Sequence, residues 1–221
     1  PLKYFRWTDG ALQWAESVGI KEGWMEVDPR AAGMAAADMA LRGLLASGGS
    51  LTNGVSSIWL SHPWIEKNAQ NELEADAMAW GAYILALEGA SNYLRHFSFS
   101  LAAVDGCGTG FPRNHQEIAV KVRNTVDSKV SPVVPGFRMT GEVLYALGPR
   151  PAFMDSGSRI LSHVRVMSNH TTRLNAMTQM DVYQLVYNLM LQGKVTCIRP
   201  VGEGGIVQAI HVKAGDKVAA D

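Results

Sequence analysis

The stretch DPRAAGMAAADMALRGLLASGG, residues 28–49, decides the fold that the sequence predicts. Asp28 can accept hydrogen bonds from the first free amides of a helix, and Pro29 suits the first helical position because it has no amide hydrogen to satisfy. Alanine and leucine, which are strong helix formers, fill ten of the 17 positions from Arg30 to Ala46. Gly48 is typical of a residue that ends a helix. The stretch therefore predicts a helix from Pro29 to about Ala46.

The sequence on both sides of this stretch predicts further helices. Capping residues such as Asp9, Ser91 and Asn114 precede several apolar segments, and glycines follow most of them. The predicted helices cover residues 11–18, 61–88, 91–104, 114–126, 141–147 and 171–193. Two β-branched runs, 195–199 and 206–212, flank a glycine-rich turn and predict a hairpin. The predicted fold class is mainly α: a helical body with a short C-terminal β hairpin.

The zero net charge of the 221 residues hides a split along the chain. Residues 1–90 contain six lysines and arginines against eleven carboxylates, whereas residues 91–200 contain twelve against six. Together with the predicted elements, this split suggests three parts. They are an acidic helical part with an aromatic terminal arm (1–104), a basic helical part (105–193) and the hairpin (194–221). The charge asymmetry predicts either an anionic partner or copies that pack acidic face on basic face.

Composition limits the class of protein. Only 18% of residues are charged, which indicates either surface buried against other copies or an alanine- and glycine-rich globular domain. No basic segment followed by an apolar run marks a secretory signal, and no apolar stretch is long enough to span a membrane. Cys107 and Cys197 lie far apart and are expected to be free thiols. The expected location is a virion or the cytoplasm, with no membrane partner.

Motifs for catalysis are absent from the sequence. The glycine-rich loop 106–110 has the wrong spacing for a dinucleotide site and follows no predicted strand. The carboxylates at 72, 74 and 76 have no histidine within helical reach, so a solvated acidic face is expected there. The six histidines are dispersed and offer no convergent ligand set. We therefore expect no catalytic residues, no metal and no cofactor.

Arginines are the strongest functional signal, because a guanidinium can hold a phosphate with two parallel hydrogen bonds. Between Asp155 and Asp181 the chain has three arginines and no carboxylate. The residues expected to bind nucleic acid are Arg95, Arg113, Lys121, Arg123, Arg159, Arg165 and Arg173. The residues expected to link copies are the aromatic ones near the N-terminus, Tyr4, Phe5, Trp7 and Trp14.

Three segments, Ser91–Phe97, Asp105–Gly106 and Phe111–Asn114, are similar to segments of helical RNA-virus coat proteins and nucleoproteins. The resemblance implies a mostly helical fold, a basic groove along the RNA backbone, and terminal arms between subunits. The predicted function is therefore a self-assembling structural protein and not an enzyme. It would be a viral or phage coat or nucleocapsid subunit that packs against copies of itself and contacts nucleic-acid phosphates, expected to be those of single-stranded RNA.

Two other functions stay open. One is an oligomeric α-helical enzyme that binds a small anionic substrate through Arg113, His115 and Arg138. The other is a protein-binding adaptor.

Overall fold

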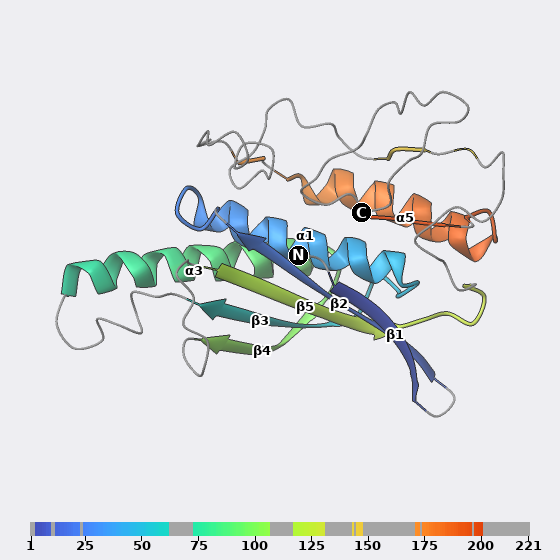
Figure 1. Cartoon of the computed structure of the whole chain (residues 1–221), viewed down its shortest axis with the longest axis horizontal. Helices are drawn as coiled ribbons and strands as arrows, with labels where there is room; N and C mark the ends of the chain where they lie inside the picture. Colours follow the sequence, from blue (N-terminus) through green and yellow to red (C-terminus); the bar gives the residue numbers. More distant parts are fainter. Residues whose placement is uncertain are drawn as a thin grey trace, which may run out of the picture.

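A five-stranded sheet with helices on one side forms the body of the protein (Figure 1). The computed structural model describes residues 3–9, 12–22, 24–61, 73–106, 117–130, 143, 145–147, 171–172, 174–195 and 197–200. Its elements are β1 (Lys3–Asp9), β2 (Leu12–Glu22), α1 (Pro29–Ala46), β3 (Val55–Ser61), α3 (Leu73–His96), β4 (Ser100–Gly106), β5 (Glu117–Thr125) and α5 (Ala176–Leu191).

The strands lie in the order β1-β2-β5-β3-β4, so the sheet is mixed. β1, β2, β5 and β3 pair antiparallel, and β3 pairs with β4 in parallel. The parallel pair is joined by α3, as a crossover between parallel strands requires. Segments far apart in the sequence thus meet at the centre of the sheet, where β5 lies between β2 and β3.

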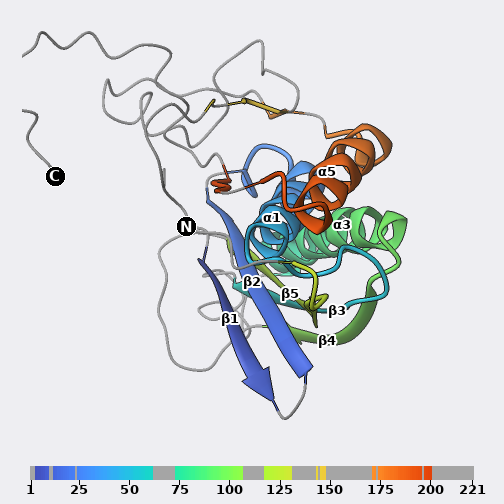
Figure 2. The same cartoon turned by 90° about the vertical axis from the view of Figure 1, so that its right-hand side faces the viewer.

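The helices form two layers over one face of the sheet. α1 and α3 lie side by side on the sheet, and α5 lies beyond them (Figure 2). The core fills the space between the sheet and α1 and α3, with fully buried side chains such as Leu41, Leu44, Ile58, Val120 and Val122. The part of the chain that the structure describes places no helix on the opposite face of the sheet (Figure 2).

The helix α1 is confirmed as predicted. The Asp28 carboxylate accepts a hydrogen bond from the Ala31 amide at 3.0 Å, and Pro29 is the first helical residue. The helix ends at Ala46, with Ser47 as its C-cap, before Gly48 with φ +84°. Gly33 lets α1 pack closely on α3, because a side chain at this position would meet the Ala86 carbonyl of α3. The last helix, α5, is also confirmed, although it starts after the cap Asn175 rather than at Thr171 or Thr172.

The predicted fold class, mainly α, is wrong, because the chain is α/β with a mixed sheet. Of the predicted helix over 11–18, the described residues 12–18 lie in β2, and residues 117–125 lie in β5. Asp9 does not cap a helix but pairs with Leu12 across a two-residue connection. The sequence Asp9-Gly10 between alternating apolar residues is a hairpin signal, and this alternation has the period of a strand.

The predicted helix over 91–104 is also wrong. α3 continues through residue 91 and ends at His96, where Ser98 adopts the left-handed conformation with φ +56°. The apolar run that follows then forms β4. The described residues of the segment 141–147, namely 143 and 145–147, are not helical.

Most of the predicted C-terminal hairpin lies outside the described residues. The division of the chain into parts at residues 104 and 193 stays a prediction. None of the described helices is long and apolar enough to cross a membrane.

Candidate anion-binding site on the open face of the sheet

The face of the sheet turned away from the helices, the open face, carries the candidate site. On β5 the side chains of Ile118, Val120 and Val122 are fully buried beneath the helices. Because side chains alternate along a strand, Lys121 and Arg123 point to the open face. Residues directly opposite on neighbouring strands share a face. The open face therefore also carries Phe5, Trp7, Leu12, Trp14, Glu16, Val18, Val55, Ser57 and Trp59.

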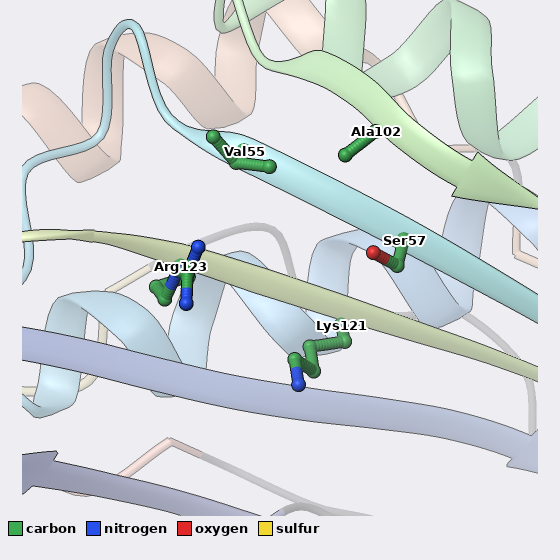
Figure 3. A pocket seen from close by; sticks show the side chains of 5 residues that line it. All are labelled: Val55, Ser57, Ala102, Lys121 and Arg123. Atoms are coloured by element: carbon green, nitrogen blue, oxygen red, sulfur yellow. The ribbon is translucent and has the colours of Figure 1, made fainter.

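A hollow of about 150 Å³ lies between these side chains, lined by Val55, Ser57, Ala102, Lys121 and Arg123 (Figure 3). It exists because β3 and β4 contribute short side chains, whereas β5 contributes two long cationic ones. Ala102 is the extra residue of a bulge, since Ser56 pairs with Leu101 and Ser57 with Ala103. Such bulges redirect a side chain at the edge of a sheet.

Two cations and two tryptophans define the electrostatics of the hollow. The Lys121 ammonium lies 3.2 Å from Glu16 Oε1 and 5.7 Å from the centre of the Trp59 ring. The Arg123 guanidinium lies 5.4 Å from the centre of the Trp14 ring. Glu16 offsets one positive charge, so these three ionised groups leave a net positive site. Arg123, which is exposed, has no carboxylate partner among the described residues.

This arrangement can hold an anion. A guanidinium and an ammonium on one side of a strand can both donate to the oxygens of a phosphate or carboxylate, and the Ser57 hydroxyl adds a further donor. The volume is smaller than the roughly 300–1,000 Å³ of a pocket for a drug-sized ligand, so the hollow itself has room for one small charged group.

A second polar cluster is buried between the helices. Asp38 Oδ1 accepts hydrogen bonds from the hydroxyls of Tyr93 at 2.6 Å and Tyr183 at 2.5 Å, and Asp38 Oδ2 lies 2.9 Å from Arg42 Nε. Burial, and secondarily the Asp38 charge, raise the pKa of Tyr93 and of Tyr183 well above the ordinary value. Perturbed groups of this kind can mark active sites. Here Asp38, Tyr93 and Tyr183 are almost fully buried and bonded to one another, so the cluster holds helices together.

The structure brings together only part of the predicted site. Lys121 and Arg123 share the open face, whereas Arg95 is exposed in the last turn of α3, on the helical side of the sheet. The remaining basic candidates lie outside the described residues, namely Arg113, Arg159, Arg165 and Arg173, as do Arg138 and His115.

The aromatic candidates do not form a terminal arm. Tyr4, Phe5 and Trp7 belong to β1, and Trp14 belongs to β2. The side chain of Tyr4 lies outside the described part, but Phe5, Trp7 and Trp14 are on the open face beside the cations.

Sequence reasoning missed Glu16, Val55, Ser57, Trp59 and Ala102. The alternation of Ile118, Val120 and Val122 with polar residues was the available signal for a strand, and a strand would have placed Lys121 and Arg123 on one face. The sequence predicts no strand before the glycine-rich loop 106–110, whereas the structure has β4 there, which ends at Gly106. No three histidine, cysteine, aspartate or glutamate side chains within the described ranges are grouped to hold a metal ion.

Comparison with known proteins finds similarity in fold alone. No protein family and no curated protein matches the sequence. Solved structures of PurL from Thermotoga maritima do match. The complex with FGAR has a TM-score of 0.52 at 11% identity and covers 87% of this chain. The complex with AMPPCP has a TM-score of 0.50 at 11% identity and covers 89%. The structure of PurLQS has a TM-score of 0.52 at 12% identity and covers 87%.

The fold resembles that of PurL. The chain spans only 30%, 28% and 28% of the lengths of those three matched chains. The resemblance to helical viral coat proteins is therefore wrong, because the fold contains the mixed sheet of a PurL-like protein. The predicted function as a coat or nucleocapsid subunit is wrong for the same reason, and nothing in the fold supports a virion. The helical fold that goes with the enzyme alternative is wrong as well, because the chain contains the mixed sheet.

Proposed function

We propose that this chain is part of an enzyme with a PurL-like fold that binds a phosphate-bearing small molecule, and that Lys121 and Arg123 hold an anionic group of this ligand. One observation carries the proposal: two cations and a serine hydroxyl surround a hollow on the open face, and one of the cations, Arg123, has no carboxylate partner among the described residues.

Each side chain has a distinct role in this proposal. The Arg123 fork donates two parallel hydrogen bonds to a phosphate, and stacking on Trp14 holds it in place. Lys121 adds a point charge whose position is fixed by Glu16. Ser57, directly opposite Lys121 on β3, donates its hydroxyl. The size of the hollow limits it to a single phosphate group, so the rest of the ligand lies outside it.

The matched structures support this class of ligand. PurL, whose fold this chain resembles, has been solved with AMPPCP and with ADP, at TM-scores of 0.50 in both cases. Both compounds are nucleotides that carry phosphate groups. The sequence left open an enzyme that binds a small anionic substrate through Arg113, His115 and Arg138. The proposal keeps this kind of ligand but assigns its binding to Lys121 and Arg123.

Isothermal titration of the full chain with ADP, with pyrophosphate and with adenosine tests the proposal. We expect ADP and pyrophosphate to bind and adenosine to bind much more weakly, because the contact is with phosphate. Arg123→Ala should weaken ADP binding by roughly 10- to 100-fold, the loss expected for a charge-assisted hydrogen bond. Lys129→Ala is the matched control, since Lys129 is an exposed cation in the turn after β5, and binding should change less than about twofold.

Two outcomes would contradict the proposal. If the unchanged chain binds neither ADP nor pyrophosphate, the chain is not a phosphate-binding protein. If Arg123→Ala and Lys129→Ala bind ADP equally well, the ligand does not bind in the hollow.

A further inference from the structure

The helix α5 lies outside a body formed by the sheet, α1 and α3, and this body is packed without it (Figure 2). Contacts between backbones hold the body together. A Cβ atom on Gly33 of α1 would lie 2.0 Å from the Ala86 carbonyl oxygen of α3, and one on Gly19 of β2 would lie 2.2 Å from the Ala36 carbonyl oxygen of α1. Neither of these contacts involves α5. The body can therefore keep its packing whether or not α5 is in place.

Only one face of α5 is attached to the body. The buried side chains of this helix recur every three or four residues, as positions on one helix face do. They are Ala176, Gln179, Tyr183, Val186 and Met190. On the remaining surface, Met177 is 55% exposed and Leu185 is 53% exposed. Among the described elements, the main contacts of α5 are with α1 and α3.

The polar contact between α5 and the body can open without leaving a buried charge unpaired. Asp38 of α1 has two partners within the body, the Tyr93 hydroxyl at 2.6 Å and Arg42 Nε at 2.9 Å. Its partner on α5 is the Tyr183 hydroxyl. A buried charge that loses its compensation makes a contact very costly to break. Here Asp38 keeps Tyr93 and Arg42 when Tyr183 leaves, so release of α5 costs one hydrogen bond and the apolar contacts of one helix face.

We infer that α5 is a releasable lid, which opens as one unit while α1 and α3 stay packed on the sheet. Its opening uncovers Asp38 and the Phe97 ring, which stacks on Tyr183 with 6.1 Å between the ring centres. An element with few contacts can open at a lower free energy than the whole molecule needs to unfold. The inference does not depend on the proposed function, because α5 and the hollow lie on opposite sides of the sheet.

Hydrogen exchange of the full chain, followed by mass spectrometry at pH 7, tests the inference. A helix of 16 residues is marginal in water without tertiary contacts, so release of α5 exposes its amides to exchange. Amides throughout α5, including the central ones, should exchange faster than those of β5. Low concentrations of urea should accelerate exchange strongly in β5 and only weakly in α5, because opening of α5 exposes little surface.

Two matched variants separate release of α5 from unfolding of the whole molecule, because Tyr93 and Tyr183 donate to the same oxygen of Asp38. Tyr183→Phe removes a bond that opening breaks, so it should accelerate exchange throughout α5 by roughly 5- to 30-fold. Tyr93→Phe removes a bond that persists when α5 opens and is lost only on complete unfolding. It should lower the urea midpoint of the protein but change exchange in α5 by less than about threefold. Circular dichroism checks that both variants are folded.

Three outcomes would overturn the inference. The first is that the central amides of α5 exchange as slowly as those of β5 and with the same dependence on urea, because α5 then opens only with the whole molecule. The second is that both variants accelerate exchange in α5 equally, which means that the Tyr93 bond does not persist. The third is that neither variant accelerates it, because α5 is then not held through Asp38.

Discussion

The Asp38 carboxylate accepts hydrogen bonds from Tyr93 and Tyr183 and lies beside Arg42, so this single residue connects α1 with both α3 and α5. The sequence gives no sign of this cluster, because the partners are 55 and 145 residues away from Asp38. A buried charge is tolerated only where it is paired and hydrogen-bonded. We therefore attribute the docking of α5, which lies in the outer layer, largely to this cluster together with the stacking of Tyr183 on Phe97.

The two buried tyrosines predict a stability that falls at high pH. Their pKa values are raised in the folded state, so the unfolded chain releases tyrosine protons first as the pH rises. The free energy of unfolding is then fully retained below about pH 10, the ordinary tyrosine pKa. Above it, the free energy falls by about 1.4 kcal/mol per pH unit for each of the two. Urea unfolding between pH 8 and 11 measures this slope.

Tyr183→Phe separates this effect from general alkaline unfolding. It should remove the contribution of one tyrosine to the slope and lower stability at pH 8 by about 1–2 kcal/mol, since the hydrogen bond to Asp38 is lost. Tyr145→Phe, at a tyrosine that is 76% exposed, should keep the original slope. Equal slopes for the unchanged chain and Tyr183→Phe would contradict the assignment.

At the scale of elements, the described helices α1, α3 and α5 end in the same hydrogen-bonded turn. In α5, Gly193 and Lys194 donate to the carbonyls of Met190 and Leu189, and in α3, Ser98 and Phe99 donate to those of Arg95 and Leu94. This turn requires a left-handed residue, which is Gly48 after α1, Gly193 after α5 and Ser98 after α3. The ends of α1 and α5 could be predicted because glycine marks them. The end of α3 could not, since serine gives no such signal.

Exchanging side chains at these ends should have opposite effects. Ser98→Gly should raise the free energy of unfolding by about 0.5–1 kcal/mol, because glycine adopts this conformation without strain. Gly193→Ala should lower it by about 1 kcal/mol, although no atom lies within 4 Å of the new methyl group. Denaturant unfolding measures both. Changes of the same sign would mean that the left-handed turn does not determine the stability of these helix ends.

The strands show why the rest of the fold was not predicted. An isolated aspartate or asparagine before an apolar segment suits a helix cap and a turn equally well, so Asp9 and Asn114 alone do not distinguish a helix from a strand. For residues 117–125, apolar and polar side chains alternate with a period of two residues. This period favours a strand over a helix. The candidate site was predicted only in part for the same reason. On a helix, positions 121 and 123 would not share a face, so Ser57 and Trp59 could not be expected beside them.

At the scale of the whole molecule, small residues hold the layers together. Of the residues of α1, most are buried, and seven of the buried ones are alanines. A low charged fraction allowed either a subunit contact or an alanine- and glycine-rich domain. The close packing of α1 against the sheet and α3 accounts for part of this composition within one chain.

The close contact between α1 and α3, which lie side by side on the sheet, gives the last prediction. A Cβ atom on Gly33 would lie 2.0 Å from the carbonyl oxygen of Ala86, which belongs to the backbone of α3 and cannot turn away as a side chain could. Gly33→Ala should therefore force α1 and α3 apart and cost about 3 kcal/mol or more, at the upper end of overpacking effects. Gly81→Ala makes the same change within α3 where nothing lies within 4 Å, and it should stabilise the protein by up to about 1 kcal/mol through helix propensity. Thermal unfolding of the two variants distinguishes these effects, because the melting temperature should fall for the first and rise for the second. If both variants melt at the same temperature, α1 and α3 are not packed as closely as Gly33 and Ala86 indicate.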